Sequence, residues 1–283
     1  MMSRRQGLLL VAPLLLVLAG FFLVPVLMLL PTSFGVYEPG AGLVKGAWSL
    51  KNYSQIVTDE YYREVIWRTL GLGFSVTLIC LLLSYPLAYL IARGPERWRV
   101  PLILLVIFPM LLNLVVRSFG WIALLANRGL INNLLMQLGV IGAPVKLLFN
   151  FVGLFIGLTH IYLPFMVLML VAAIRNMPRD VESAAATLGS SRAHVFMAVT
   201  LPLSAPGILA GSILVFVLTI SALVTPRMLG GPTYQVMATL IYDEYMQLLD
   251  WPSGSALSFA LTFMAVAIIW LSSRLTKRWA GMA

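Results

Sequence analysis

The sequence predicts an all-α polytopic membrane protein with six transmembrane helices, and three observations carry that prediction. Of the 283 residues, 60% are hydrophobic and only 10% are charged, whereas a soluble domain carries roughly 25% charged residues. The apolar residues gather in runs of about 20, the length at which a helix crosses a bilayer. The basic residues gather at the ends of these runs. A lipid bilayer is therefore the expected solvent of most of the chain.

Six apolar runs within a single domain of residues 1–283 are the predicted spans. The first holds about 23 uncharged residues, more than the roughly 7–15 apolar residues of a signal peptide. We therefore expect it to be retained as a helix. The third is interrupted by Pro109, Asn113 and Arg117. The spans cover approximately residues 8–30, 66–92, 101–125, 151–174, 203–224 and 256–273.

Three longer connections, at residues 31–63, 126–150 and 225–254, are predicted to be surface loops on one side of the membrane. The first is polar and aromatic, and a short helix is expected near Asn52–Val57. The second is expected to contain an interfacial helix around Leu130–Leu138.

The polar stretch from Arg175 to Pro202 differs from its surroundings and has about the length of two short helices. Asn176 or Asp180 can cap the first helix, with Pro178 in its opening turn. Residues 181–188 are rich in alanine and leucine, which favour helix. Gly189 suits the left-handed residue that ends a helix, and Ser190 or Ser191 can cap the second helix, which continues to Pro202. This pattern predicts a compact projection that a soluble partner could bind.

The distribution of charge predicts the orientation. On the side of both termini, 11 of the 19 Lys and Arg residues face three acids, Glu96, Asp180 and Glu182, a net charge of 11 − 3 = +8. The other side carries seven basic and seven acidic residues, and Arg117 lies at membrane depth. Because cytoplasmic loops carry the excess of Lys and Arg, both termini and the polar stretch are expected in the cytoplasm. The same distribution argues against a nucleic-acid-binding face.

Part of the polar stretch resembles the EAA loop of the permease subunits of binding-protein-dependent ABC importers. The resemblance rests on the spacing from Ser183 to Pro202, with the loop's usual glutamate falling on Ser183 and Glu182 preceding it by one residue. In that family the loop forms coupling helices that dock on a cytoplasmic ATPase. The resemblance implies that the ATPase-coupling residues are Glu182, Ser183, Ala184, Ala185, Gly189, Leu201 and Pro202.

The resemblance extends to the first permease subunit of spermidine/putrescine-type systems. Residues 109–135, 225–232 and 250–252 are similar to segments of that subunit. It implies a bacterial inner-membrane complex containing two ATP-binding subunits, a second permease and a periplasmic solute-binding protein. It does not fix the solute, since similar permeases are associated with polyamines, aminobutyrate, aminoethylphosphonate and opines.

The sequence indicates no catalytic or metal site. It contains no Gly-x-x-x-x-Gly-Lys-Ser/Thr motif, so ATP and Mg²⁺ are expected on the partner ATPase and no cofactor on this chain. One cysteine, Cys80, and two histidines give no metal-ligand spacing. His160 is interpreted first as a hydrogen-bonded contact between helices. The pairs Gly153/Gly157 and Gly207/Gly211 are spaced for close helix packing, although chance explains them equally well.

A candidate translocation path follows from Asn113, Arg117 and Trp121, which lie four residues apart and therefore on one helix face. A charged side chain facing lipid at depth costs at least about 2.5 kcal/mol, so Arg117 should face the interior or reach water. A structural role, with Arg117 extending to the interface or contacting a neighbouring span, is the alternative. In the outer loop, Asp243 and Glu244 are expected to be solvated or to contact the binding protein.

Two other function classes remain open from the sequence. A secondary transporter or channel with six spans would explain the hydropathy, but it should show ionisable residues paired across spans or an internal repeat. A structural or enzymatic membrane subunit would leave the polar stretch at 175–202 unexplained.

Overall fold

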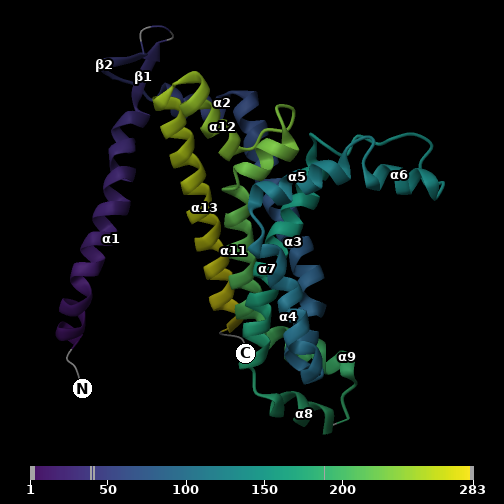
Figure 1. The fold of residues 1–283 in the computed structure, drawn as a ribbon. Helices are drawn as coiled ribbons and strands as arrows, with labels where there is room; N and C mark the ends of the chain where they lie inside the picture. The colour runs from purple at the N-terminus through teal and green to yellow at the C-terminus, as the bar shows by residue number, and fades with distance from the viewer. Residues whose placement is uncertain (1–3, 39, 41, 188, 281–283) are drawn as a thin grey trace. The chain divides into compact units, whose positions relative to one another are not determined.

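The computed structural model describes residues 4–38, 40, 42–187 and 189–280, which are mostly helical (Figure 1). The chain divides into two compact units. The first unit contains Met1–Arg63 and Leu240–Phe263, and the second contains Glu64–Thr239 and Met264–Ala283. Leu188, the predicted last residue of the first cytoplasmic helix, lies outside the described residues.

Five helices among the described residues are long and apolar enough to cross a membrane, and six if one bent pair counts as one span. The bent pair joins Arg192–Leu203 to Ala205–Ile220 at an angle of 62°. The third predicted span, at 101–125, consists of two helices that separate at Leu112 and Asn113, and Asn113 is one of the residues that interrupt its apolar run. The Asn113 side chain caps the second piece by accepting from the Val115 amide, at 2.8 Å.

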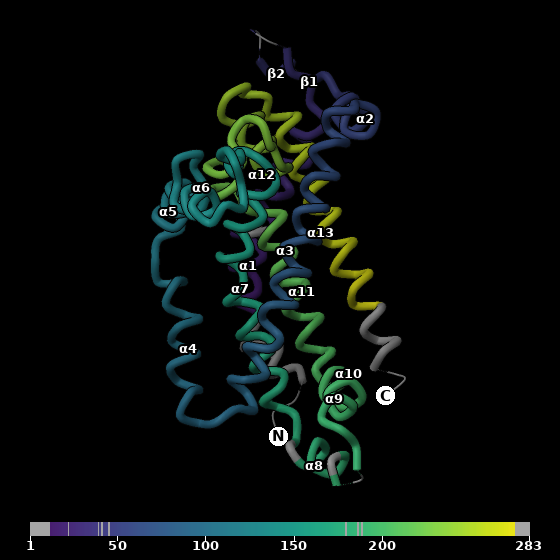
Figure 2. The backbone as a smooth tube through the Cα atoms, turned by 90° about the vertical axis from the view of Figure 1, so that its right-hand side faces the viewer, coloured from purple at the N-terminus to yellow at the C-terminus, as the bar shows by residue number. Residues whose placement is uncertain are grey.

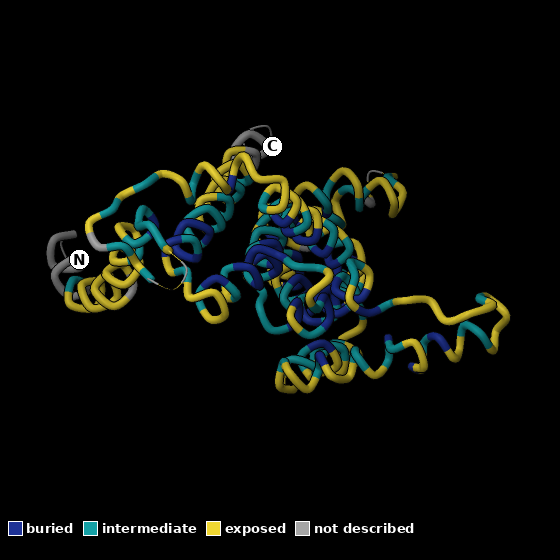
Figure 3. The backbone as a smooth tube through the Cα atoms, turned by 90° about the horizontal axis from the view of Figure 1, so that it is seen from above, coloured by how far each residue is buried: buried dark blue, intermediate teal, exposed yellow. Residues whose placement is uncertain are grey.

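The first unit contains α1 (Arg4–Ser33), which is mostly exposed in the described structure (Figure 3). It continues with the antiparallel strands β1 (Gly35–Glu38) and β2 (Gly42–Trp48). The helix α2 (Lys51–Thr58) confirms the helix expected near Asn52–Val57. The π-helical turn η3 (Glu244–Leu248) and the start of α13 (Trp251–Ala280) complete this unit.

The hairpin in the first unit was not predicted. Its strand pairing is irregular between Gly35 and Val36, and the partner strand holds Gly46 at φ +76°. A glycine at positive φ is typical of a β-bulge. Asn52 on α2 fixes the hairpin by donating to the carbonyl oxygens of Ser33 and Gly35, at 3.0 and 3.1 Å.

The second unit is a helical bundle, shown as a tube in Figure 2. Its helices from α3 to α7 include α6, which confirms the predicted helix of the second loop. The polar segment α8, α9 and the π-turn η1 follow, and the chain then returns through α10 and α11 to η2 and α12. The bounds are α3 (Glu60–Arg93), α4 (Glu96–Leu111), α5 (Leu114–Leu125), α6 (Leu130–Gln137), α7 (Phe151–Asn176), α8 (Arg179–Thr187), α9 (Arg192–Val195), η1 (Phe196–Thr200), α10 (Leu201–Leu203), α11 (Ala205–Ile220), η2 (Pro226–Gly230) and α12 (Met237–Asp243).

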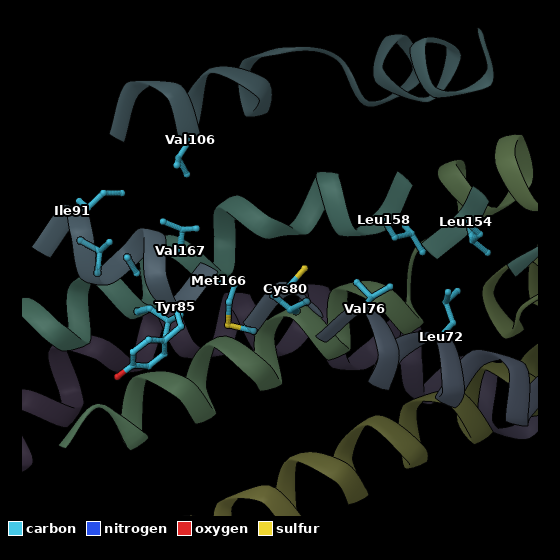
Figure 4. Close-up of a cluster of buried hydrophobic side chains, with 14 of the residues drawn as sticks. Leu72, Val76, Cys80, Tyr85, Ile91, Val106, Leu154, Leu158, Met166 and Val167 are labelled. Carbon is cyan, nitrogen blue, oxygen red and sulfur yellow. The ribbon is translucent and has the colours of Figure 1, made fainter. Parts of the chain in front are cut away.

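The core of the second unit lies along α7. Of the residues in the most apolar 18-residue stretch of this helix, 56% are buried. Figure 4 shows buried side chains of α3 and α7 in one cluster, to which α4 contributes Val106. Hydrogen bonds to backbone also join α3 and α7, from Cys80 Sγ to the Thr159 carbonyl oxygen and from Ser84 Oγ to that of Leu163. Such interhelical hydrogen bonds contribute to packing in membranes.

Glycines allow α7 and α11 to approach closely. A Cβ added at Gly207 would overlap the Cβ of Ala173, and one at Gly211 would lie 2.8 Å from the Met166 sulfur. Gly157 faces Leu229 of η2 with similarly little room. The packing interpretation of the Gly207/Gly211 pair is therefore confirmed. Gly153 instead lies against the Leu147 carbonyl oxygen, just before its own helix.

Candidate functional site

The polar segment at residues 175–204, here called the coupling segment, lies at one end of the second unit's helices (Figures 1 and 2). α8 follows α7 after Met177 and Pro178, and α9 leads through η1 and α10 into α11. The predicted arrangement of two short helices around a glycine is therefore confirmed. Both expected caps of the first helix are wrong, because Asn176 is the last residue of α7 and Asp180 lies inside α8.

Backbone geometry sets the turn between the two helices. Gly189 has φ +85°, and the Ser190 amide donates to the Ala185 carbonyl oxygen at 3.3 Å. This six-to-one hydrogen bond with a left-handed glycine is the Schellman ending of a helix. The Ser191 side chain then accepts from the His194 amide at 3.3 Å, which caps α9. A Cβ at Gly189 would have no neighbour within 4 Å, so its conformation rather than space requires glycine.

The predicted docking residues on α8 are accessible. Ser183 and Ala184 are exposed and Ala185 is half-buried. Their small side chains leave the helix surface open to close approach by another backbone. Leu201 is half-buried and Pro202 exposed, at the opening of α10.

Side chains on one face of α3 contact the coupling segment. Tyr85 and Tyr89 both contact Phe196 of η1 edge to face, with ring centroids 5.4 and 6.0 Å apart. The Tyr85 hydroxyl also shares a 2.7 Å hydrogen bond with the Ser204 hydroxyl. Because residues four apart share a helix face, Arg93 extends the same row toward α8.

Arg93 and Glu182 form an ion pair that the sequence analysis missed. Arg93 Nε lies 3.1 Å from Glu182 Oε2, and the two side chains are only 9% and 17% exposed. The Nε–H makes no aligned hydrogen bond, so this contact is mainly electrostatic. The other carboxylate oxygen, Glu182 Oε1, accepts from the Thr200 hydroxyl at 2.9 Å. Arg93 Nη2 donates to the Met177 carbonyl oxygen at 3.1 Å.

The sequence contains both residues of this pair but gives no sign that they meet. Arg93 is one of several basic residues at the end of a span, which the positive-inside rule already explains. Nothing in sequence spacing links it to a carboxylate 89 positions later. Contact of Glu182 with an ATPase stays a prediction, and within the chain its carboxylate already has two partners.

The candidate path residues divide into two kinds. Asn113 caps α5, and the Trp121 Nε1–H donates to His160 Nδ1 at 3.2 Å. That bond confirms the interpretation of His160 as a helix–helix contact. Arg117 is different, because its Nε and Nη1 are buried and have no hydrogen-bond partner. Asn113 and Trp121 therefore make hydrogen bonds within the chain, whereas Arg117 retains two buried donors without partners.

In the outer loop, the expectation that Asp243 and Glu244 are solvated is wrong for Glu244, which is buried at 5% exposure. The Tyr62 hydroxyl donates to Glu244 Oε1 at 3.4 Å. Burial raises the pKa of the Glu244 carboxyl, and the neighbouring charge of Asp250 acts in the same direction. Asp243 is half-buried and accepts from the Gln247 amide at 2.7 Å. Among the described residues, no group of three His, Cys, Asp or Glu could hold a metal ion.

Solved structures of other transporters share this fold. A bacterial ABC transporter involved in the import of the acidic polysaccharide alginate is similar with a TM-score of 0.78 and 18% identity, over 97% of this chain and 96% of that one. An amino acid ABC transporter is similar over 80% of this chain and 97% of that one, with a TM-score of 0.54 and 16% identity.

Sequence comparisons are more specific. The spermidine/putrescine permease PotB of Salmonella typhimurium is 34% identical over 91% of this chain and 90% of its own length. PotB of Escherichia coli is 33% identical over 91% of this chain and 94% of its own. The molybdenum permease ModB of Mycobacterium bovis is 30% identical over 76% of this chain and 80% of its own. Residues 84–280 match the family described as binding-protein-dependent transport system inner membrane component. The chain belongs to this family of inner membrane components of binding-protein-dependent transport systems.

Proposed function

We propose that this ABC importer permease passes ATP-driven motion into the membrane through its coupling segment, where α8 docks on a cytoplasmic ATPase. The observation that carries the proposal is the turn at Gly189, which presents the exposed Ser183 and Ala184 on a short helix beyond the end of α7. Small side chains on an exposed helix permit an ATPase groove to approach the backbone closely. Family membership does not favour the alternative of a secondary transporter or channel.

The partners proposed are two ATP-binding subunits, a second and similar permease, and a periplasmic solute-binding protein. ATP and Mg²⁺ belong to the ATP-binding subunits, since the sequence contains no P-loop motif. One of the similar solved structures is a complex with a periplasmic protein, which supports the last partner. Purification of the chain from its native membrane should recover these subunits, whereas recovery of the chain alone as a homo-oligomer would contradict this composition.

The proposed orientation places both termini and the coupling segment in the cytoplasm. Its support is the net charge of +8 on that side and about zero on the other. In a Cys80→Ser background, cysteines at Ser191 and Lys51 should react with an impermeant reagent from opposite faces. Reaction of both from outside would refute the orientation.

The proposed solute is a polyamine or a related small amine. Its support is the similarity to PotB, the permease protein of a spermidine/putrescine transport system. The decisive measurement is ATP hydrolysis by the reconstituted complex with its periplasmic protein and either spermidine, putrescine, molybdate or aminoethylphosphonate. Stimulation by the amines is expected. Stimulation by molybdate alone would contradict the solute class, and stimulation by aminoethylphosphonate alone would exclude a polyamine; both outcomes leave the importer function intact.

For the path, we propose that Arg117 borders the route of the solute as a fixed positive charge, with Asn113 and Trp121 on the same stripe. The support is its pair of buried donors without partners. Arg117→Gln and Trp121→Ala should alter solute KM or selectivity at matched membrane levels, and Arg128→Gln, at an exposed position, serves as the control. Wild-type uptake kinetics in both variants would leave only the structural role.

A further inference from the structure

The coupling segment is a short exposed structure that must move a much larger helical bundle. α8 has nine residues, and isolated helices shorter than about 12–15 residues are marginal in water. Among the residues that the structure describes, no backbone hydrogen bond links α8 sideways to the bundle, so side chains must make that connection. Glu182 makes two such contacts, with Arg93 of α3 and with Thr200 of η1.

Glu182 lies at the centre of a polar cluster that joins three parts of the chain. Its carboxylate meets Arg93 at the end of α3 and the buried hydroxyl of Thr200 in η1. Through its Nη2, Arg93 also holds the carbonyl oxygen of Met177, the residue between α7 and α8. The cluster therefore fixes both the hinge at the start of α8 and the first turn of that helix.

Burial makes this cluster different from other ion pairs of the chain. Arg93 and Glu182 are 9% and 17% exposed, whereas Glu96 in the nearby pair with Arg99 is 92% exposed and 3.8 Å away. Exposed pairs contribute little. Removing one partner of a mostly buried pair leaves the other charge without compensation, which is strongly unfavourable. The Arg93–Glu182 geometry is therefore maintained far more strictly than that of a surface pair.

We propose that Arg93, Glu182 and Thr200 form a latch that sets the angle of α8 against α3, so that displacement of α8 by the ATPase is transmitted to α3 instead of bending the hinge at Met177. These are positioning residues: they act through α8 and not through contact with ATP or solute. Tyr85, Tyr89 and Arg93 then form one continuous face of α3, which contacts the coupling segment and takes up its displacement. This inference rests on the proposed coupling function.

The test compares five single variants in the purified complex. Arg93→Gln and Glu182→Gln remove one charge each, Arg93→Lys retains the charge, and Arg99→Gln, in the first turn of α4, is the matched control. Two readouts are taken: hydrogen exchange of the α8 amides, and the ratio of solute-stimulated to basal ATP hydrolysis. Thr200→Val, which removes one hydroxyl at nearly constant volume, covers the case in which a charge variant does not assemble.

For the two Gln variants, the latch predicts about tenfold faster exchange in α8, the order expected from losing a charge-assisted contact. In Arg93→Gln, whose residue is not among those predicted to dock on the ATPase, stimulated hydrolysis should fall while basal hydrolysis stays at the wild-type level; for Glu182→Gln, exchange of the α8 amides is the readout. Arg93→Lys should recover most of both signals, Thr200→Val should show a smaller change in the same direction, and Arg99→Gln should match wild type.

Wild-type exchange in α8 of Arg93→Gln, Glu182→Gln and Thr200→Val would overturn the latch. Faster exchange with undiminished stimulation would also overturn it, because the contact would then be structural only. If the wild-type complex itself shows no stimulated hydrolysis, the proposed function fails instead, and the exchange of α8 still decides whether the contact holds that helix.

Discussion

Two glycine positions in the second unit show how differently its parts are stabilised. Gly207 lies where α7 and α11 touch, and an added Cβ there would overlap Ala173. Gly189 lies in the coupling segment, has φ +85°, and an added Cβ there would meet nothing within 4 Å. The first glycine is required by space and the second by backbone conformation.

This difference separates folding from coupling. Packing between α7 and α11 determines whether the bundle forms, since close approach of helices is a main source of association in lipid. The coupling segment depends on a turn, a serine cap and one buried ion pair. Substitutions in the two regions should therefore give different defects, one in assembly and the other in transport.

The largest effect is expected from Gly207→Val. Added volume at a packed contact costs roughly 1–3 kcal/mol and sometimes more, and here the clash involves the Ala173 side chain of the facing helix. We expect a lower melting temperature and loss of monodisperse protein in detergent. Gly71→Val is the matched control, because a Cβ at this helical position would meet nothing within 4 Å. Equal stability of the two variants would show that close contact with Ala173 does not require glycine at position 207.

Gly189→Val should give the opposite pattern. A left-handed conformation costs an L-residue about 1–2 kcal/mol, so the turn should rearrange while the bundle remains intact. We expect normal membrane levels and melting temperature, with stimulated ATP hydrolysis reduced about tenfold. Gly189→Asn should retain most activity, because Asn tolerates this conformation best after Gly. A fall in membrane level equal to that of Gly207→Val would show that the two regions are not separable.

The smallest effect is expected at Glu244, a buried carboxyl in the outer loop. Its raised pKa means that the folded segment retains the proton more tightly than the unfolded chain. The stabilisation is present in full below the ordinary glutamate pKa and is lost as pH rises through the raised value. The charged or titratable groups facing Glu244 are Tyr62, Asp243 and Asp250.

In the Glu244→Gln variant, the protection of this segment against hydrogen exchange should therefore stay constant as the pH rises to neutral and above. The measurement is the hydrogen-exchange protection factor of Glu244–Leu248 from pH 4 to 8, with the exposed Glu38→Gln as control. Protection in wild type should fall with rising pH, and the Glu244→Gln variant should lack that slope. If protection still falls with rising pH in the Glu244→Gln variant, another titratable group causes the pH dependence.

The membrane helices were predictable because long apolar runs determine them almost alone. The hairpin at Gly35–Trp48 was not, since its glycines break strand periodicity and its anchoring depends on Asn52. The break after α4 depends on Asn113 acting as a cap, a residue assigned to the path by its spacing. The π-helical turns have no sequence signature, because one extra residue per turn does not change hydropathy.

At the candidate site, local chemistry was predictable and tertiary chemistry was not. Gly189 and Ser191 act on residues within a few positions, so their roles could be inferred from the sequence alone. The partners of Glu182 come from distant segments, α3 and η1, and only the fold brings them together. The glycine spacing at Gly207 and Gly211 left packing and chance equally open until the facing residues were known.

If α8 is the surface that meets the ATPase, a site-specific cross-link from α8 should reach that subunit. In the Cys80→Ser background, a cysteine replacing the exposed Ala184 and bearing a photoactivatable group should form an adduct with a P-loop ATPase in the intact transport complex. The same probe at the exposed Val140, in the loop after α6, should form none. Absence of an ATPase adduct at Ala184 in a complex that still hydrolyses ATP in response to solute would contradict the account.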